Sequence, residues 1–288
     1  MPPATPGPVG VFDSGAGGLS VAAAIRSALP DQSLVYFADT AFAPYGTRSD
    51  QEILARTQAC CSALLEQGVA ALVVACNTAT ANAIDQLRAW APVPVIGVEP
   101  GLKPAAAATR NGTVGVLATR ATLASRRYRE LLFRVGSQAP AVRFVEHAAV
   151  GWVELVEAGD LESVHARTLV RQAVQPLLDA GADTLVLGCT HYPFLRAAIE
   201  AVAGGVHIVE TGPAVARELL RRLPQAPAGA TPYAAGDEAP RPARAAAGIR
   251  FEASGDTAAF AALAGQLLAG MSAAGAAAHG VRRDLAGA

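Results

Sequence analysis

Short apolar runs alternate along most of the chain with longer segments of helical composition. The runs are rich in Val, Leu and Ile and are bounded by turn residues, as buried strands are. They predict strands at Val9–Phe12, Leu34–Ala38, Leu72–Ala75, Pro94–Val98, Val114–Leu117, Val142–His147, Leu185–Leu187 and His207–Glu210. The segments between them predict helices ending near Leu29 and Leu132, and spanning Asp50–Gln67, Ala79–Ala89, Val164–Ala180, Pro193–Ala203 and Pro213–Leu223. This alternation is typical of an α/β fold whose largely parallel sheets are covered by helices.

Part of this pattern occurs twice. Residues 64–78 and 177–191 each run from a helix end through a glycine into a buried strand, and each strand is followed by a cysteine, Cys76 or Cys189. Each half also opens on a Val-Gly-Val strand, at Val9 and at Val114. A unit built twice, with a thiol at the same place, predicts two similar α/β domains whose thiols face one another. Inversion of a stereocentre is the chemistry that needs two equivalent proton-transfer groups on opposite sides of one carbon.

Composition excludes several classes of protein. Among the 288 residues, 52% are hydrophobic and 16% are charged, which describes a folded globular chain. A formal net charge of -1 gives no support for a nucleic-acid partner. No apolar run approaches the ~20 residues of a membrane span, and Met1–Pro8 lacks the features of a signal peptide. Four cysteines without a disulfide framework favour free thiols in a reducing cytoplasm.

Several candidate residues follow predicted strands, at the edge where open parallel sheets bind ligands. These are Asp13, Cys76, Thr119 and Cys189. A thiol before a helix N-terminus is favoured as a thiolate, although most free cysteines are simply small buried hydrophobes. The repeated environment favours a function for the pair. His191, two residues after Cys189, has the chemistry to orient or charge a neighbouring group.

The glycine-rich turn after Asp13 has two interpretations. Asp13-Ser14-Gly15-Ala16-Gly17-Gly18 lacks the spacing of a dinucleotide fingerprint and the Lys of a P-loop. A carboxylate at this place would also repel phosphate. The Asp13 carboxylate instead suits an ammonium group or a proton-transfer partner. The alternative interpretation is that the segment is a plain tight turn.

The sequence predicts no cofactor and no metal. Lys103 is the only lysine and has no motif around it, so a pyridoxal phosphate Schiff base is disfavoured. Cys60 and Cys61 are adjacent in a predicted helix, without a ligand cluster, and are expected to be core residues. His147 and His165 lie in ordinary strand and helix contexts.

Four motifs in order resemble those of glutamate racemase, a cofactor-independent family. They are Gly10-Val11-Phe12-Asp13-Ser14-Gly15 with Gly17-Gly18-Leu19-Ser20, Asp39-Thr40 with Pro44-Tyr45-Gly46, Cys76-Asn77-Thr78, and Gly188-Cys189-Thr190-His191-Tyr192-Pro193. The resemblance extends to Ser254-Gly255-Asp256. Aspartate racemases share the paired cysteines, but the Asp-Ser-Gly start and the Pro-Tyr-Gly loop are closer to the glutamate branch.

The resemblance implies two pseudo-symmetric domains, residues 1–100 with 210–288 and residues 101–209, and an active site in the cleft between them. It implies that Cys76 and Cys189 transfer the protons, assisted by Asp13 and by His191 respectively, with Glu157 as a further polar partner. It also implies that glutamate is held by Asp13, Ser14, Pro44, Tyr45, Gly46, Asn77, Thr78, Thr119, Thr122, Thr190 and His191. It further implies that the product is D-glutamate, which feeds bacterial peptidoglycan synthesis and hence cell-wall biogenesis and cell shape.

This chain departs from the family pattern at a few positions. Ala38 stands where Gly is usual, Phe42 replaces a common Arg, Ala149-Val150 replaces a Cys-Pro pair, and Glu210-Thr211 replaces Asp-Ser. None of these changes removes an expected catalytic residue.

Two alternatives remain open from the sequence. In the first, the chain is a racemase whose substrate is aspartate or another small amino acid. In the second, the chain has an added role as an inhibitor of DNA gyrase, as some glutamate racemases have. A homodimer is also left open.

Overall fold

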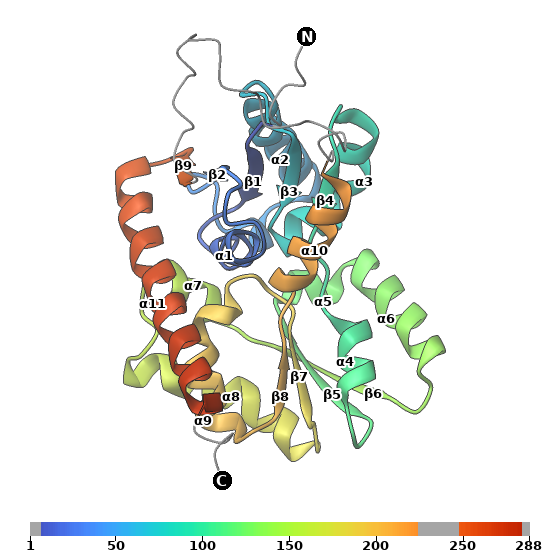
Figure 1. The fold of residues 1–288 in the computed structure, drawn as a ribbon. Coiled ribbons are helices and arrows are strands. Elements are labelled where there is room, and N and C mark those ends of the chain that lie inside the picture. The colour runs from blue at the N-terminus through green and yellow to red at the C-terminus, as the bar shows by residue number, and fades with distance from the viewer. Residues whose placement is uncertain (1–6, 224–247, 284–288) are drawn as a thin grey trace, which may run out of the picture.

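The computed structural model describes residues 7–223 and 248–283. The loop expected at Pro224–Gly248 lies outside these ranges, apart from Gly248. The described chain forms two parallel sheets covered by helices, one above the other in Figure 1. This arrangement confirms the predicted α/β class.

The first sheet has five strands in the order β4-β3-β1-β2-β9. Every pairing in it is parallel, with Val11 opposite both Tyr36 and Val73. The strands are β1 (Val9–Asp13), β2 (Leu34–Ala38), β3 (Ala71–Val74), β4 (Val95–Gly97) and β9 (Ile249–Ala253).

The second sheet has four parallel strands in the order β6-β5-β7-β8. They are β5 (Thr113–Ala118), β6 (Arg143–Ala148), β7 (Thr184–Leu187) and β8 (His207–Val209). Read from the opposite edge, β8-β7-β5-β6 repeats the order β4-β3-β1-β2 of the first sheet. The repeat seen in the sequence is therefore also a repeat of strand topology.

Helices cover both sheets (Figure 1). They are α1 (Leu19–Ala28), α2 (Asp50–Leu65), α3 (Asn77–Trp90), α4 (Leu102–Ala108), α5 (Arg120–Ala124), α6 (Arg126–Gln138), α7 (Trp152–Glu157), α8 (Val164–Asp179), α9 (Arg196–Ala203), α10 (Gly212–Arg222) and α11 (Thr257–Arg283), with 3-10 turns η1 (Tyr45–Thr47) and η2 (Tyr192–Leu195). None of the helices in the described ranges has the length and hydropathy needed to cross a bilayer.

Local sequence signals explain several helix boundaries. Ser49 and Glu52 form a capping box at the start of α2, because each side chain bonds the main-chain N–H of the other. Thr119 caps α5 through the N–H of Thr122, and Ser125 caps α6 through the N–H of Tyr128. The chain after β5 therefore forms two helices, and the second continues past the expected end near Leu132 to Gln138.

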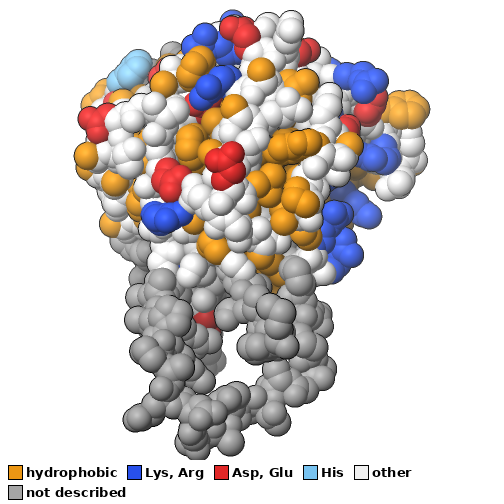
Figure 2. All heavy atoms as spheres, turned by 90° about the horizontal axis from the view of Figure 1, so that it is seen from above, with side chains coloured by type: hydrophobic (Ala, Val, Ile, Leu, Met, Phe, Trp, Pro, Cys, Tyr) orange, Lys and Arg blue, Asp and Glu red, His pale blue; other side chains and the backbone are white. Residues whose placement is uncertain are grey.

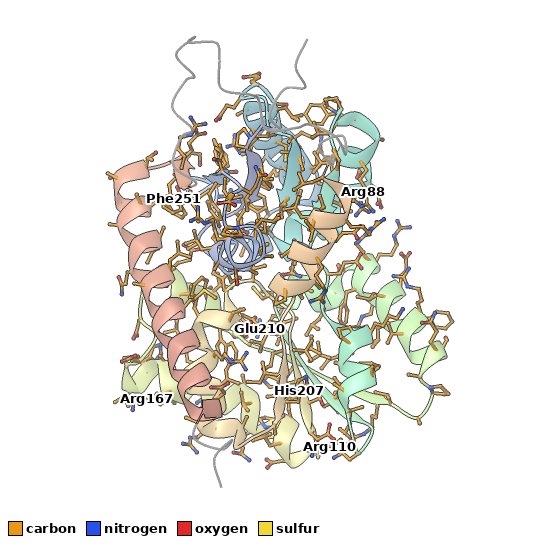
Figure 3. All side chains as sticks on the ribbon, viewed as in Figure 1. Arg88, Arg110, Arg167, His207, Glu210 and Phe251 are labelled. Atoms are coloured by element: carbon orange, nitrogen blue, oxygen red, sulfur yellow. The ribbon has the colours of Figure 1, made fainter. Side chains whose placement is uncertain are left out.

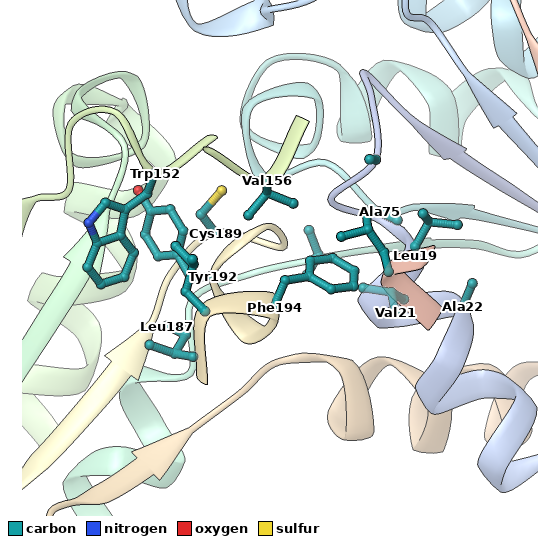
Figure 4. Close-up of a cluster of buried hydrophobic side chains, with 14 of the residues drawn as sticks. Leu19, Val21, Ala22, Ala75, Trp152, Val156, Leu187, Cys189, Tyr192 and Phe194 are labelled. Atoms are coloured by element: carbon teal, nitrogen blue, oxygen red, sulfur yellow. The ribbon is translucent and has the colours of Figure 1, made fainter. Parts of the chain in front are cut away.

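The main hydrophobic core crosses from one sheet to the other. Val11 and Val73 of the first sheet and Leu185 and Leu187 of the second belong to the same buried cluster. Figure 4 shows part of it, with Phe194 near Leu19 and Val21 of α1, and Trp152 beside Tyr192. Separate clusters lie on the outer faces of the two sheets. The shared core holds the two repeated units together. The first unit is built on the five-stranded sheet, and the second unit is built on the four-stranded sheet.

Some elements were not predicted. They are the edge strand β9, the short helices α4 and α7, and α11, which Figure 1 shows running from β9 past α7 to α8 and α9. α11 continues to Arg283.

The outer surface carries charges of both signs. Figure 2 shows Lys and Arg side chains interspersed with Asp and Glu on the face seen from above.

An ion pair lies at the end of β8. The labelled Glu210 in Figure 3 lies where the chain leaves β8 for α10, and Arg196 donates to its carboxylate at 2.7 Å.

Candidate active site

The predicted site residues gather where the carboxyl ends of β1 and β3 in one sheet approach those of β5 and β7 in the other. Asp13 ends β1, Cys76 follows β3, Thr119 follows β5 and Cys189 follows β7. Hydrogen bonds join residues that follow β1 to residues of the unit that forms the second sheet. Ser20 Oγ in α1 donates to the carbonyl of Thr190 at 2.7 Å, and Ala16 N–H donates to Glu157 at 2.8 Å. The repeat therefore brings its two thiol-bearing loops to the same junction.

Cys76 is the N-cap of α3 and is buried, with 6% of its surface exposed. Its Sγ accepts from the N–H of Ala79 at 3.4 Å, and Ser14 Oγ lies 3.4 Å from the same sulfur. Burial, and then the negative charge of Asp13, raise the pKa of this thiol to about 12. Cys76 is therefore a neutral thiol at neutral pH.

Cys189 is the first member of a buried relay. Its Sγ lies 3.6 Å from Nδ1 of His191, and Nε2 of His191 lies 2.7 Å from Oε1 of Glu157. Burial lowers the pKa of His191, but Cys189 and Glu157 outweigh it and bring the pKa well above its ordinary value. Burial raises the pKa of Glu157, and the histidine lowers it overall. The pair is thus an imidazolium–carboxylate pair, and the imidazolium donates toward the sulfur.

The glycine-rich turn after β1 fits closely against this relay. A Cβ added to Gly17 would stand 2.3 Å from Nδ1 of His191, and one on Gly15 would stand 2.1 Å from Oε1 of Glu157. An alanine at either position would therefore displace the carboxylate or the imidazole that it meets. The turn is more than a change of chain direction, because it packs on the imidazole and carboxylate of the second unit.

Asp13 is fully buried at the end of β1. Its Oδ2 accepts from the N–H groups of Gly15 at 3.1 Å and Gly18 at 3.0 Å, and the hydroxyl of Tyr36 lies 3.5 Å away. Burial raises the pKa of the carboxyl, although the charge of His191 opposes it. Within the described residues Asp13 Oδ1 has no hydrogen-bond partner. That oxygen is available to a bound polar group.

Asn77 and Thr78 begin α3 beside Cys76, and both are largely buried. Neither amide atom of the Asn77 side chain has a hydrogen-bond partner in the part of the chain that the structure describes. A buried amide without partners is costly unless a ligand supplies them. Asn77 therefore has the properties of a binding residue.

The Pro44-Tyr45-Gly46 segment leads into η1 and reaches the second unit. A Cβ placed on Gly46 would stand 3.9 Å from Cβ of Ala121 in α5. The Tyr45 hydroxyl is already used, since it donates to Asp39 Oδ2 at 2.6 Å. What Tyr45 offers a ligand as a donor is therefore its main-chain N–H.

Thr119 and Thr122 bond each other at the start of α5, with their hydroxyl oxygens 3.0 Å apart. Thr190 is buried beside Cys189. The other cysteines lie elsewhere: Cys60 and Cys61 are buried in α2 within the core on the outer face of the first sheet, as expected. Among the described residues no group of His, Cys, Asp or Glu side chains has the arrangement of a metal site.

Three groups that support the site residues by hydrogen bonds were not predicted from the sequence. Tyr36 donates to the carbonyl of Gly15 at 2.9 Å, Ala16 N–H binds Glu157, and Arg56 binds Asp39. The alternation in β2 and α2 marks Tyr36 and Arg56 only as strand and helix residues. Their links to the site exist only in three dimensions.

Comparison with known proteins places this site in a class of enzymes. A sequence model of Asp/Glu/Hydantoin racemases matches residues 19–219. The chain belongs to this racemase family.

Several similar proteins are glutamate racemases. The chain is 51% identical to the glutamate racemase of Cupriavidus pinatubonensis over 77% of this chain and 81% of the relative. It is 55% identical to that of Methylococcus capsulatus over 75% and 79% respectively. The crystal structure of a glutamate racemase isoform from Bacillus anthracis superimposes with a TM-score of 0.75 at 31% identity, covering 91% of this chain and 94% of that one. The Escherichia coli glutamate racemase, in complex with L-glutamate and an activator, gives 0.70 at 38% identity over 76% and 83%.

Proposed function

We propose that this chain is an isomerase that interconverts L- and D-glutamate without a cofactor, using Cys76 and Cys189 as its two proton-transfer groups. The observation that carries the proposal is the repeated unit with a buried thiol after each equivalent strand, at one junction. Family membership and identities of about half to glutamate racemases support glutamate as the substrate.

The two thiols act on opposite faces of the substrate Cα. One, as thiolate, removes the α-proton, and the other, as thiol, donates a proton to the opposite face. The configuration inverts, and each sulfur ends in the protonation state that its partner had. The roles exchange with the enantiomer, so that neither direction needs a group the other lacks.

Each thiol has its own partner. On one side Asp13 lies near Cys76, and the amides at the start of α3 favour the thiolate through Ala79 N–H. On the other side His191, held by Glu157, lies against Cys189. When Cys76 acts as the base, its thiol proton first passes to the Asp13 carboxylate, and the α-ammonium of the substrate favours the resulting thiolate.

The binding groups surround this pair. We assign the α-ammonium and the carboxylates of glutamate to Asp13, Ser14, the Pro44-Tyr45-Gly46 segment, Asn77, Thr78, Thr119, Thr122, Thr190 and His191. The unpartnered buried atoms of Asp13 and Asn77 support this assignment. Preorganised donors at the α-carboxylate stabilise the charge that develops when the α-proton leaves.

The domain division we propose is residues 1–100 with 210–288, and residues 101–209. The first set contains the five-stranded sheet and the second contains the four-stranded sheet, which supports the boundaries. The catalytic residues then lie between the domains. D-glutamate made here would supply peptidoglycan synthesis in the cytoplasm, and the buried free thiols suit that compartment.

The test is incubation of the purified protein with L-glutamate in heavy water, following optical rotation and deuteration at Cα. We expect rotation to decay to zero and every product molecule to carry deuterium. Deuteration without inversion would contradict a two-sided mechanism. Parallel incubations with L-aspartate and other small amino acids test the alternative substrates, and a gyrase supercoiling assay tests the added inhibitory role.

A further inference from the structure

The Tyr45 hydroxyl is anchored on a buried carboxylate rather than turned toward the site. Asp39 is fully buried, directly after β2, and its Oδ2 accepts from Tyr45 at 2.6 Å. A buried carboxylate is costly unless it is paired and hydrogen-bonded. Asp39 therefore needs a cation beside it. Because Asp39 also binds the Tyr45 hydroxyl, the cation that holds Asp39 in place also holds Tyr45.

The cation is Arg56 of α2. Its Nε donates to Asp39 Oδ2 at 3.0 Å and its Nη2 donates to Oδ1 at 2.7 Å, which makes a bidentate pair. The guanidinium also lies over the ring of Phe42, 3.7 Å from its centroid. Only a planar guanidinium makes two parallel hydrogen bonds and an aromatic stack at once.

These contacts fix both ends of the turn that leads into η1. Phe42, at the start of the turn, is held under the guanidinium, while Tyr45, at its end, is held through the shared carboxylate. The Tyr45 ring also packs at 6.2 Å from that of Phe12 in β1. Burial raises the pKa of Asp39, but Arg56, Tyr45 and Ser254 outweigh it and lower the pKa overall. The carboxylate thus stays charged at neutral pH.

The turn is where the first unit reaches the second, since Gly46 stands against Ala121 of α5. Thr119 and Thr122 lie in the same helix start. A displacement of the turn would change the gap between these threonines and the main chain of Tyr45 and Gly46.

We propose that Arg56 is a positioning residue for substrate binding, which sets the Pro44-Tyr45-Gly46 segment against α5 by clamping Asp39 and Phe42. The inference rests on the proposed function for its kinetic consequence, but the positioning itself is independent of it. Arg56 touches no substrate in this scheme. It acts through Asp39 on Tyr45.

The first experiment compares Arg56→Ala, Arg56→Lys and the parent enzyme. We expect KM for glutamate to rise about tenfold to a hundredfold in Arg56→Ala, the range of a lost charge-assisted hydrogen bond, with a smaller change in kcat. Lys keeps the charge but loses the second hydrogen bond and the stack, so we expect an intermediate KM. Ethylguanidine added to Arg56→Ala should lower KM again, because 29% of the Arg56 side chain is exposed and the vacated space opens to solvent.

The second measurement does not depend on activity. Amide hydrogen exchange over residues 41–48 should be faster in Arg56→Ala than in the parent chain. Arg129→Ala is the matched control, because it removes an arginine that pairs with Glu146 on the surface of the second unit. We expect it to leave both KM and this exchange unchanged.

Unchanged KM and unchanged exchange in a folded Arg56→Ala would overturn the proposal. Should that variant not fold, Tyr45→Phe removes the same anchor from the other side, and unchanged exchange over residues 41–48 would then be the overturning result. A parent chain without glutamate racemisation would refute the proposed function instead, while the exchange comparison would still decide the role of Arg56.

Discussion

Gly17 of the first unit lies against His191 of the second, so closely that a Cβ on Gly17 would stand 2.3 Å from the imidazole Nδ1. The same nitrogen is the one that faces Cys189 Sγ. The glycine is therefore required by the neighbour it meets, since its φ is not positive.

Gly17→Ala should displace the imidazole from Cys189 and lower kcat. A displacement of about 1 Å at a catalytic group can cost about a hundredfold in rate. Steady-state kinetics of racemisation measures the effect. Gly136→Ala in α6 is the control, because a Cβ there meets nothing within 4 Å. Equal kcat values for the two variants would show that His191 is not constrained by the turn.

Asp13→Asn should lower turnover by about 10²–10⁴, the usual contribution of general acid–base assistance. The amide keeps an oxygen to accept the N–H groups of Gly15 and Gly18, so the fold should persist. Turnover is measured beside the thermal midpoint of unfolding. A variant with normal turnover would make Asp13 a residue of the turn alone.

Cys76→Ser and Cys189→Ser should each abolish racemisation while retaining chemistry on one face of Cα. Each variant should still eliminate HX from one enantiomer of a β-substituted glutamate analogue, where no reprotonation is needed. The preferred enantiomers should be opposite in the two variants. Matching preferences, or racemisation by either variant, would refute the paired-thiol mechanism.

Glu157→Gln should make the thermal stability less dependent on pH. The folded-state pKa of His191 lies above its ordinary 6.5, so its stabilisation is complete below about that pH and is lost as pH rises through the folded value. The folded-state pKa of Glu157 lies below its ordinary 4.5, so its stabilisation is present above that value and is lost as pH falls through the folded one.

The difference in free energy of unfolding between the parent and Glu157→Gln should therefore be largest between about pH 5 and 6.5, at about 1.5–3 kcal/mol for a charged hydrogen bond. Thermal or urea unfolding at several pH values measures it. A difference that does not vary with pH would mean that the two groups are not an ion pair.

Exhaustive chelation should leave the racemisation rate unchanged, whereas thiol alkylation should abolish it. Both thiols are 94% buried, with 6% of each residue exposed, so alkylation should be slow, and glutamate should slow it further. Loss of activity on chelation, with recovery on adding a metal, would contradict the cofactor-free mechanism.

The strands and the paired thiols were predictable because they depend on local signals. A buried parallel strand needs an apolar run, and the repeat of 64–78 in 177–191 appears in the sequence itself. By contrast, β9 is an edge strand in which Arg250 and Glu252 alternate with apolar residues, and it carries no long apolar run. Helices α4 and α7 have only seven and six residues, too few for a periodic pattern to stand out.

The polar supports of the site were not predictable from the residues alone. Glu157 lies in an ordinary helical segment, and only the resemblance selected it. Arg56 and Tyr36 meet Asp39 and Gly15 through the packing of α2 and β2 on β1, which no spacing along the chain encodes. Phe42, which stands where the family usually has Arg, lies under the guanidinium of Arg56.

Oε1 of Glu157 has partners in both units of the molecule: it accepts from the N–H of Ala16 in the first and lies 2.7 Å from Nε2 of His191 in the second. Glu157 and His191 both lie in the unit that forms the four-stranded sheet, so a separation of the two units would break the bond from Ala16 and leave the imidazole–carboxylate pair intact. The positive charge beside Cys189 is thus held within its own unit, and the other unit hydrogen-bonds to that pair through the N–H of Ala16.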